Sequence, residues 1–174
     1  QIMELAGFEK GELDLLDASP PCPPFSMSGS KRKGWNKEKV AYGKKQKNIE
    51  DLTWEVIRIA KETMPKVIVC ENVKGLTMEY AADHFQKMIK DTEALGYHTT
   101  YKVLRGHDYG VPQKRERVFM VSVRDDVVKD VGLNFMTMST LFPNPETHEP
   151  TVREAIEDLQ DDPNNKEEAQ ELTE

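Results

Sequence analysis

Residues 66–73 read Lys-Val-Ile-Val-Cys-Glu-Asn-Val, and this stretch decides the fold class. The unbroken apolar run at 67–70 is typical of a strand that is buried on both faces of a parallel sheet. Cys70, inside the run, is expected to be a core residue. The run passes directly into Glu71 and Asn72. Polar side chains are therefore expected at the carboxyl end of this strand, where α/β sheets place their ligand sites.

The segments around this strand alternate between helix and strand patterns. Strands are predicted over residues 13–18, 97–104 and 118–123, and helices over residues 2–8, 48–64, 81–95 and 151–159. Pro65 ends the first long helix and Gly96 ends the second. The order strand, helix, strand, helix and then a pair of strands predicts an α/β fold with a mostly parallel sheet.

Length and composition exclude several classes of protein. The chain has 174 residues, of which 37% are hydrophobic, and this is enough for one domain with a core. Since there is no long apolar segment and there are only two cysteines, we expect no membrane span and no disulfide framework. The expected compartment is the cytoplasm. The sequence begins with Gln1 rather than Met, and we expect a further segment before it.

Charge is distributed unevenly along the chain. The formal net charge is -7, but residues 31–47 carry eight basic side chains and one acidic side chain, a local balance of +7. Residues 146–174 carry a balance of -9. The basic segment could face the phosphates of a nucleic acid, and a solvated mobile loop explains the same charges equally well. Residues 160–174 are acidic and polar, and we expect them to be disordered.

Cys22 lies in the proline-rich segment 20–26, PPCPPFS, after the predicted strand at 13–18. Four prolines exclude a helix or a central strand, so the segment is expected to be a rigid loop at a strand end. A cysteine there has the fixed position and solvent access that a nucleophile needs. An ordinary small residue in a proline turn is the alternative. A protease-like pair is not favoured, because no histidine has an obvious acid to orient it.

Two further groups of polar residues lie near strand ends. Glu71 emerges from an apolar strand, where partial desolvation favours a carboxyl group that donates a proton; a solvated turn acid is the alternative. Residues 113–117, QKRER, precede another strand, and alternation puts Arg115 and Arg117 on one face. Two arginines on one face can bind phosphate or a carbonyl oxygen, or they can form a surface ion-pair ladder.

The three segments occur along the chain in the order PPCPPFS at 20–26, ENV at 71–73 and DYGVPQKRER at 108–117. In order and spacing they resemble the DNA (cytosine-5) methyltransferases of bacterial and phage type, including those of restriction–modification systems. The resemblance covers roughly residues 13–123, and TVREAI at 151–156, followed by Leu159, resembles the family's next block. Pro23 is the one departure in the first motif, because the family usually has glutamine there.

The resemblance implies the fold of the S-adenosylmethionine-dependent methyltransferases, which is Rossmann-like and here partial, with the C-terminal half of the sheet. It implies transfer of a methyl group from S-adenosylmethionine to C5 of a cytosine that is flipped out of double-stranded DNA. Cys22 would form a covalent bond to C6 of the base. Glu71 would contact N3 and the exocyclic amine, Arg117 would contact O2, and Arg115 would contact phosphate.

The resemblance also implies binding roles for other residues. Pro21 and Leu52 match positions that touch the methyl donor, and no metal is implied. The lysine-rich segment 26–46 matches the mobile loop that closes over DNA. The residues expected to bind DNA are Ser26, Lys31, Arg32, Lys33 and Gln113.

Parts of the family's pattern are absent from the sequence. It has neither the Phe-x-Gly-x-Gly loop of the cofactor site nor the acids that hold ribose and adenine, and we expect the target-recognition region to lie beyond it. We therefore expect a fragment of the catalytic core at 1–125, the start of the link toward the recognition region at 126–159, and a tail at 160–174. The fragment alone is expected to be inactive, to bind no S-adenosylmethionine, and to self-associate through the sheet edge at 13–18.

Two alternatives stay open. A tRNA cytosine-5 methyltransferase shares the same three motifs, because the region that distinguishes the two substrates is absent. The alternative from another class is a non-catalytic subunit of a split enzyme, which would bind a partner chain that carries the cofactor loop.

Overall fold

The computed structural model describes residues 2–21, 39–41, 44–46, 52–134 and 136–158. It divides into two compact units. Unit 1 comprises Gln1–Leu104 and Arg117–Pro143, and unit 2 comprises Arg105–Glu116 and Asn144–Glu174. Within the described part of the chain, no helix has the length and apolar character that a membrane span requires.

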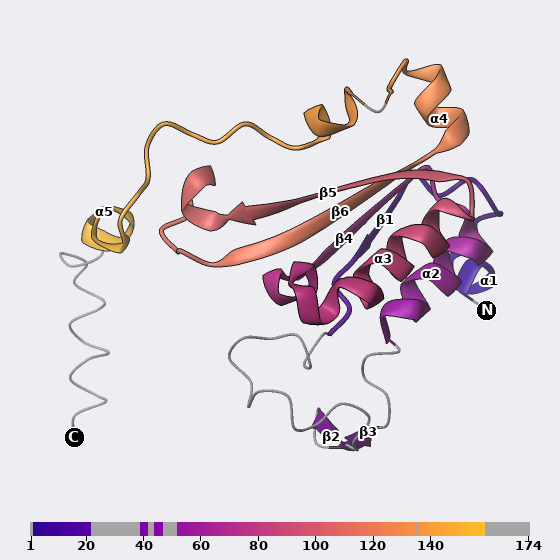
Figure 1. Cartoon of the computed structure of the whole chain (residues 1–174), viewed down its shortest axis with the longest axis horizontal. Helices are drawn as coiled ribbons and strands as arrows, with labels where there is room; N and C mark the ends of the chain where they lie inside the picture. The colour runs from indigo at the N-terminus through magenta and orange to yellow at the C-terminus, as the bar shows by residue number, and fades with distance from the viewer. Residues whose placement is uncertain (1, 22–38, 42–43, 47–51, 135, 159–174) are drawn as a thin grey trace. The chain divides into compact units, whose positions relative to one another are not determined.

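Unit 1 is built on a four-stranded sheet with the order β1-β4-β6-β5. β1 (Leu15–Ala18) pairs in parallel with β4 (Val67–Val73), β4 pairs antiparallel with β6 (Glu116–Arg124), and β5 (Tyr97–Arg105) lies outermost (Figure 1). The predicted α/β fold is confirmed, but the prediction of a mostly parallel sheet is wrong. β5 and β6 are joined by a short connection without a crossover helix, and a parallel pair needs such a crossover.

Helices α2 (Leu52–Thr63) and α3 (Ala82–Glu93) cover one face of the sheet (Figure 1). The buried side chains in these contacts are Ala60, Phe85 and Met88 of the helices and Ile68, Cys70, Val118 and Met120 of the strands. Cys70 is 2% exposed, which confirms that it is a core residue, and burial raises the pKa of its thiol to about 12. Gly96, with a φ of 90°, follows α3 as predicted.

The opposite face of the sheet is covered only in part by the described residues. α4 (Asp125–Asp130) and the 3₁₀ turn Met138–Leu141 cover one end of it, where Val128 and Met138 pack with Val123. Along β4 the burial alternates, so that Glu71 is half-buried while Asn72 is buried. The prediction that this strand is buried on both faces is therefore wrong, because both long helices lie on the same face.

The remaining elements are short. α1 (Ile2–Ala6) ends at Gly7, and β2 (Lys39–Ala41) pairs antiparallel with β3 (Lys44–Gln46). In unit 2, α5 (Val152–Ile156) begins after Thr151, whose hydroxyl and backbone form a capping box with Glu154. α5 is shorter than the predicted helix at 151–159. Residues 48–51 of the predicted second helix and the tail at 160–174 lie outside the described residues.

Candidate functional site

Glu71 and Arg117 lie on neighbouring strands and form an ion pair. The register of β4 and β6 pairs Glu71 with Phe119 and Val73 with Arg117, so the two charged side chains lie diagonally on the same face. Nε of Arg117 lies 2.7 Å from Oε1 of Glu71, and the side chains are 22% and 28% exposed. The fold thus brings together two predicted site residues that are far apart in the sequence.

The ion pair determines what Glu71 can offer a ligand. In the pair the guanidinium of Arg117 donates and the carboxyl group of Glu71 accepts. Since both side chains are partly exposed, a ligand can reach them. A base that separated the pair would meet a carboxyl group that accepts hydrogen bonds or, when protonated, donates one, and a guanidinium that donates them.

The segment that leads into Cys22 begins beside the strand of Glu71. The register pairs Ala18 of β1 with Cys70 of β4, and parallel strands end at the same edge of a sheet. Pro20 and Pro21 follow after Ser19 and are half-buried. Of the predicted site residues, Cys22, Ser26, Lys31, Arg32 and Lys33 lie outside the described residues.

Asn72 is part of the ENV segment, but the sequence reasoning gave it no role of its own. Its side chain is 3% exposed, and its Nδ2 donates a hydrogen bond to the carbonyl oxygen of Pro20 over 3.3 Å. Alternation along the strand was the available signal, because Asn72 shares its face with the apolar Ile68 and Cys70. A polar side chain on a buried face needs hydrogen-bond partners, and these partners define its role.

Pro21 and Leu52 are the predicted contacts of the methyl donor. Pro21 follows β1 and Leu52 begins α2, and both side chains are half-buried. Neither side chain carries a hydrogen-bonding atom, whereas the amino-acid and ribose groups of S-adenosylmethionine need donors and acceptors. These two residues alone do not fit the whole cofactor, and we derive no step of the reaction from them.

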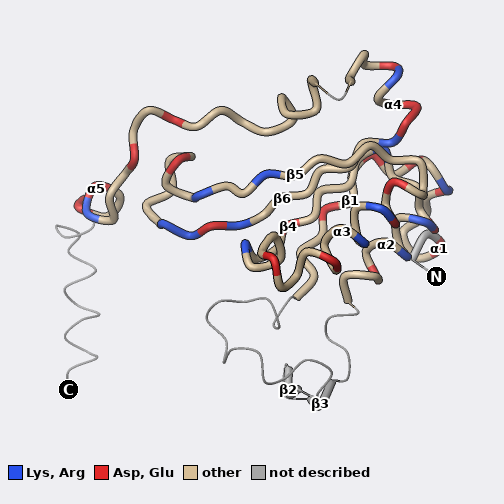
Figure 2. The backbone as a smooth tube through the Cα atoms, in the orientation of Figure 1, with Lys and Arg blue, Asp and Glu red and all other residues tan. Residues whose placement is uncertain are grey.

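Arg115 and Gln113 lie in unit 2, in the connection between β5 and β6. This connection begins with the 3₁₀ turn Gly106–Tyr109 and is closed by a hydrogen bond from the N–H of Gly106 to the carbonyl oxygen of Arg115, 2.9 Å long. A Cβ at Gly106 would lie 2.9 Å from the carbonyl oxygen of Gln113, so only glycine fits there. Arg115 and Gln113 are exposed, and Figure 2 shows basic positions on both sides of an acidic one where β6 begins.

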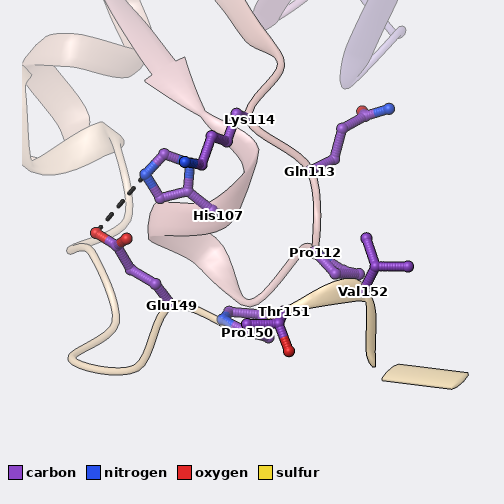
Figure 3. A pocket seen from close by; sticks show the side chains of 8 residues that line it. All are labelled: His107, Pro112, Gln113, Lys114, Glu149, Pro150, Thr151 and Val152. Atoms are coloured by element: carbon purple, nitrogen blue, oxygen red, sulfur yellow. Dashed lines mark ion pairs between the residues drawn. The ribbon is translucent and has the colours of Figure 1, made fainter. Parts of the chain in front are cut away.

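The same turn contributes to a groove in unit 2 (Figure 3). Its lining residues are His107, Pro112, Gln113, Lys114, Glu149, Pro150, Thr151 and Val152. Nε2 of His107 lies 3.1 Å from Oδ1 of Asp108 and 3.6 Å from Oε1 of Glu149. The expectation that no histidine has an acid to orient it is therefore wrong for His107.

His107, Asp108 and Glu149 also form a donor set that could hold a metal ion. A metal ion on Nε2 would leave the ring proton on Nδ1, but Nδ1 is buried and has no hydrogen-bond partner among the described residues. The contacts instead favour the tautomer in which Nε2 carries the proton and faces the two carboxylates. The cluster therefore connects the 3₁₀ turn to the segment before α5.

Comparison with known proteins shows the family of the chain. The family model described as C-5 cytosine-specific DNA methylase matches residues 1–174. The chain belongs to this family. The Type II methyltransferase M.FnuDI of Fusobacterium nucleatum is 35% identical, over 92% of this chain and 42% of that protein. M.SacI of Streptomyces achromogenes is 36% identical, over 72% of this chain and 30% of that protein. The chain thus spans less than half the length of these DNA methylases.

A solved structure supports the fold assignment. A protein described as a DNA modification methyltransferase encoded within an E. coli prophage matches with a TM-score of 0.62 and 22% identity, over 89% of this chain and 37% of that chain. At this identity the match shows the fold alone. The partial Rossmann-like methyltransferase fold that the three motifs implied for this DNA methylase is confirmed.

Proposed function

We propose that this chain carries the catalytic centre of a DNA cytosine-5 methyltransferase. The observation that carries the proposal is the ion pair of Glu71 on β4 with Arg117 on β6, in which Oε1 and Nε lie 2.7 Å apart. β4 also pairs with β1, the strand that leads into Cys22. An acceptor and a donor side by side match the exocyclic amine and O2 of cytosine. Membership in the DNA methylase family supports the same substrate.

In the proposed reaction the target cytosine leaves the duplex and separates the ion pair of Glu71 and Arg117. Each of the two side chains then contacts the base instead of the other side chain. Arg117 donates hydrogen bonds to O2, while the protonated carboxyl group of Glu71 accepts one from the exocyclic amine and donates its proton to N3. The thiolate of Cys22 bonds to C6, and the electrons of the C5–C6 double bond make C5 nucleophilic. Bound S-adenosylmethionine, which Pro21 and Leu52 do not hold by themselves, would supply the methyl group. Water then takes the C5 proton, the thiolate of Cys22 leaves C6, and N3 returns its proton to Glu71, which restores the ring.

Variants of the two cysteines test this proposal in the enzyme that contains the chain. Cys22→Ser should remove both methyl transfer and the covalent complex with DNA that contains 5-fluorocytosine. Cys70→Ser is the matched control, because Cys70 is buried in the core, and it should retain the chemistry. Normal turnover of Cys22→Ser would overturn the mechanism. Methylation of tRNA in place of double-stranded DNA would favour the tRNA enzyme.

DNA binding is proposed for residues of two separate segments of the sequence. Arg115 and Gln113 of the exposed turn, together with Ser26, Lys31, Arg32 and Lys33, would contact the DNA. Neutralising Lys31, Arg32 and Lys33 should weaken binding to every DNA sequence and reduce the slope of log K against log salt by roughly 0.9 for each phosphate that the protein no longer neutralises. An unchanged slope would contradict this role. Residues 126–159 would lead toward the target-recognition region. An enzyme that acts on bacterial DNA would work in the cytoplasm.

The edge strand β1 favours a second candidate, a subunit of a split enzyme. β1 lies at the edge of the described sheet, and Leu15 is 51% exposed. An exposed apolar edge can pair with another chain, either a second copy or a partner that carries the cofactor loop. We expect the 174-residue chain to self-associate in sedimentation experiments, and Leu15→Lys to shift it toward monomer. Calorimetry should detect no binding of S-adenosylmethionine; tight stoichiometric binding by a monomer would contradict both expectations.

A further inference from the structure

Asn72 connects the strand of Glu71 to the segment that leads into Cys22. Its Nδ2 donates to the carbonyl oxygen of Pro20 over 3.3 Å, and its Oδ1 accepts from the N–H of Val73 over 2.8 Å. Because an N–H group occupies Oδ1, only one orientation of the amide satisfies both contacts. The donor of Asn72 is thereby directed at Pro20.

The two prolines limit how this segment can be hydrogen-bonded to its neighbours. At the start of β1 the parallel strands are held by backbone hydrogen bonds, in which Lys66 and Val67 donate to residues 13 and 14. Pro20 and Pro21 have no N–H group, so their carbonyl oxygens are the main-chain groups through which they can be held. Nδ2 of Asn72 donates to one of these oxygens at the point where the paired residues of β1 have ended.

Adjacent side chains of β4 therefore act on opposite faces of the sheet. Glu71 lies on the partly exposed face and pairs with Arg117, while Asn72 lies on the buried face. Both belong to the same rigid strand, and both are one or two residues from its end. Any shift of residues 20–21 relative to Glu71 must break or lengthen the hydrogen bond to Pro20.

We propose that Asn72 is a positioning residue that sets the place of residues 20–21 relative to Glu71. The inference rests on the proposed function, because it concerns the reaction in which Cys22, the next residue, bonds to a base held by Glu71 and Arg117. That step requires the sulfur to reach C6 while the base keeps its contacts. A misplacement of about 1 Å in such a geometry reduces a rate about 100-fold.

Asn72→Asp tests the donor directly, since it keeps the shape of the side chain and replaces the N–H donor by an acceptor. In the enzyme that contains this chain, the rate of covalent complex formation on 5-fluorocytosine DNA at saturating DNA should fall at least about tenfold. The dissociation constant for the same DNA should be unchanged. The ratio of variant to wild-type rate should rise as the pH falls, because a protonated carboxyl group can donate to Pro20 again.

Tyr97→Phe is the matched control. The hydroxyl of Tyr97 donates to the carbonyl oxygen of Pro65 over 2.6 Å, so this change also removes a buried hydrogen bond to a proline, but at the other end of β4. It should lower stability and leave the rate of complex formation at the wild-type value. An equal slowing in Tyr97→Phe would overturn the inference, because the effect would then come from stability alone.

The remaining outcomes separate the two proposals. Wild-type rates in both Asn72→Asp and Asn72→Ser would overturn the positioning role, whatever Cys22→Ser shows. Normal turnover of Cys22→Ser would overturn the proposed function instead. Failure of both Asn72 variants to fold, with Tyr97→Phe folded, would assign Asn72 a role in stability and overturn the inference as well.

Discussion

The two ends of β4 differ in what their polar side chains bind. At the amino end, Tyr97 donates to the carbonyl of Pro65, and Nη1 of Arg124 donates to the carbonyl oxygens of Met64 and Gly11. At the carboxyl end, Glu71 and Arg117 bind each other, and Asn72 binds the backbone of Pro20 on the other face of the sheet. A side chain that binds a backbone group fixes the place of that segment. Two side chains that hold each other at a partly exposed position can exchange their partner for a ligand.

Arg124 illustrates the structural end. Its guanidinium contacts the carbonyl group that follows α2 and also pairs with Asp126 over 2.7 Å. A cation is favourable at the carboxyl end of a helix, where carbonyl groups lack partners. Met64 has a φ of 48°, so the chain turns sharply there between α2 and β4. The amino end of β4 is therefore a junction that the fold itself requires.

Removal of the carboxylate at the functional end should have the largest effect on activity. Glu71→Gln, in the enzyme that contains this chain, should reduce the rate of methyl transfer roughly 10² to 10⁴-fold, because an amide has no proton to transfer to N3 as negative charge develops on the base. The melting temperature should change little, since the pair with Arg117 is partly exposed. Single-turnover methylation and thermal unfolding measure the two effects.

Asp14→Asn is the control at the structural end. Asp14 pairs with Lys66 over 2.7 Å, and both side chains are exposed. This variant should retain the full rate. A large reduction of the rate in Asp14→Asn, or a normal rate in Glu71→Gln, would remove the distinction between the two ends.

Removal of the guanidinium at the structural end should have the largest effect on stability. Arg124→Met should lower the free energy of unfolding by about 2 kcal/mol, because backbone carbonyls lose a charged donor. Arg58→Met is the control, since Arg58 pairs with Glu55 and Glu62 on an exposed surface of α2, and it should cost less than about 1 kcal/mol. Urea unfolding of the 174-residue chain measures both. Equal decreases would show that Arg124 is an ordinary surface cation.

The hydroxyl of Tyr97 should make stability depend on pH at high pH. Burial raises the pKa of Tyr97 from 10.0 to about 12, so the folded state retains this proton more firmly than the unfolded state. The resulting stability is fully present below pH 10 and is lost as the pH rises toward 12. Tyr97→Phe should cost about 1 kcal/mol at neutral pH, and this cost should shrink between pH 10 and 12. Urea unfolding at several pH values tests this, and a constant difference would contradict it.

The smallest effect expected is at Cys70. Burial raises the pKa of this thiol to about 12, and the side chain is 2% exposed, so alkylation of the native chain should modify Cys22 and leave Cys70 intact. In denaturant both of the chain's two cysteines should react. Mass spectrometry of the labelled chain distinguishes the two. Rapid native labelling of Cys70 would mean that the core under α2 and α3 opens easily.

Much of the fold could be predicted because it depends on local patterns. The apolar run at 67–70, Pro65 after α2 and Gly96 after α3 are determined by side-chain hydrophobicity and backbone geometry, which act over a few residues. The direction of β6 could not be read in the same way. It depends on which strand β6 pairs with. The partner, β4, is distant in the sequence, and the residues of β6 do not by themselves determine this pairing.

The site shows the same division. The sequence by itself determined the candidate residues, because the order of the three segments resembles the family and the chemistry of Glu71 and Arg117 is a property of their side chains. Only the tertiary structure decided that these two form an ion pair and that Asn72 reaches Pro20. Both contacts depend on strand register, which packing of the whole sheet sets. A shift of β6 by one residue relative to β4 would put Glu71 and Arg117 on opposite faces of the sheet.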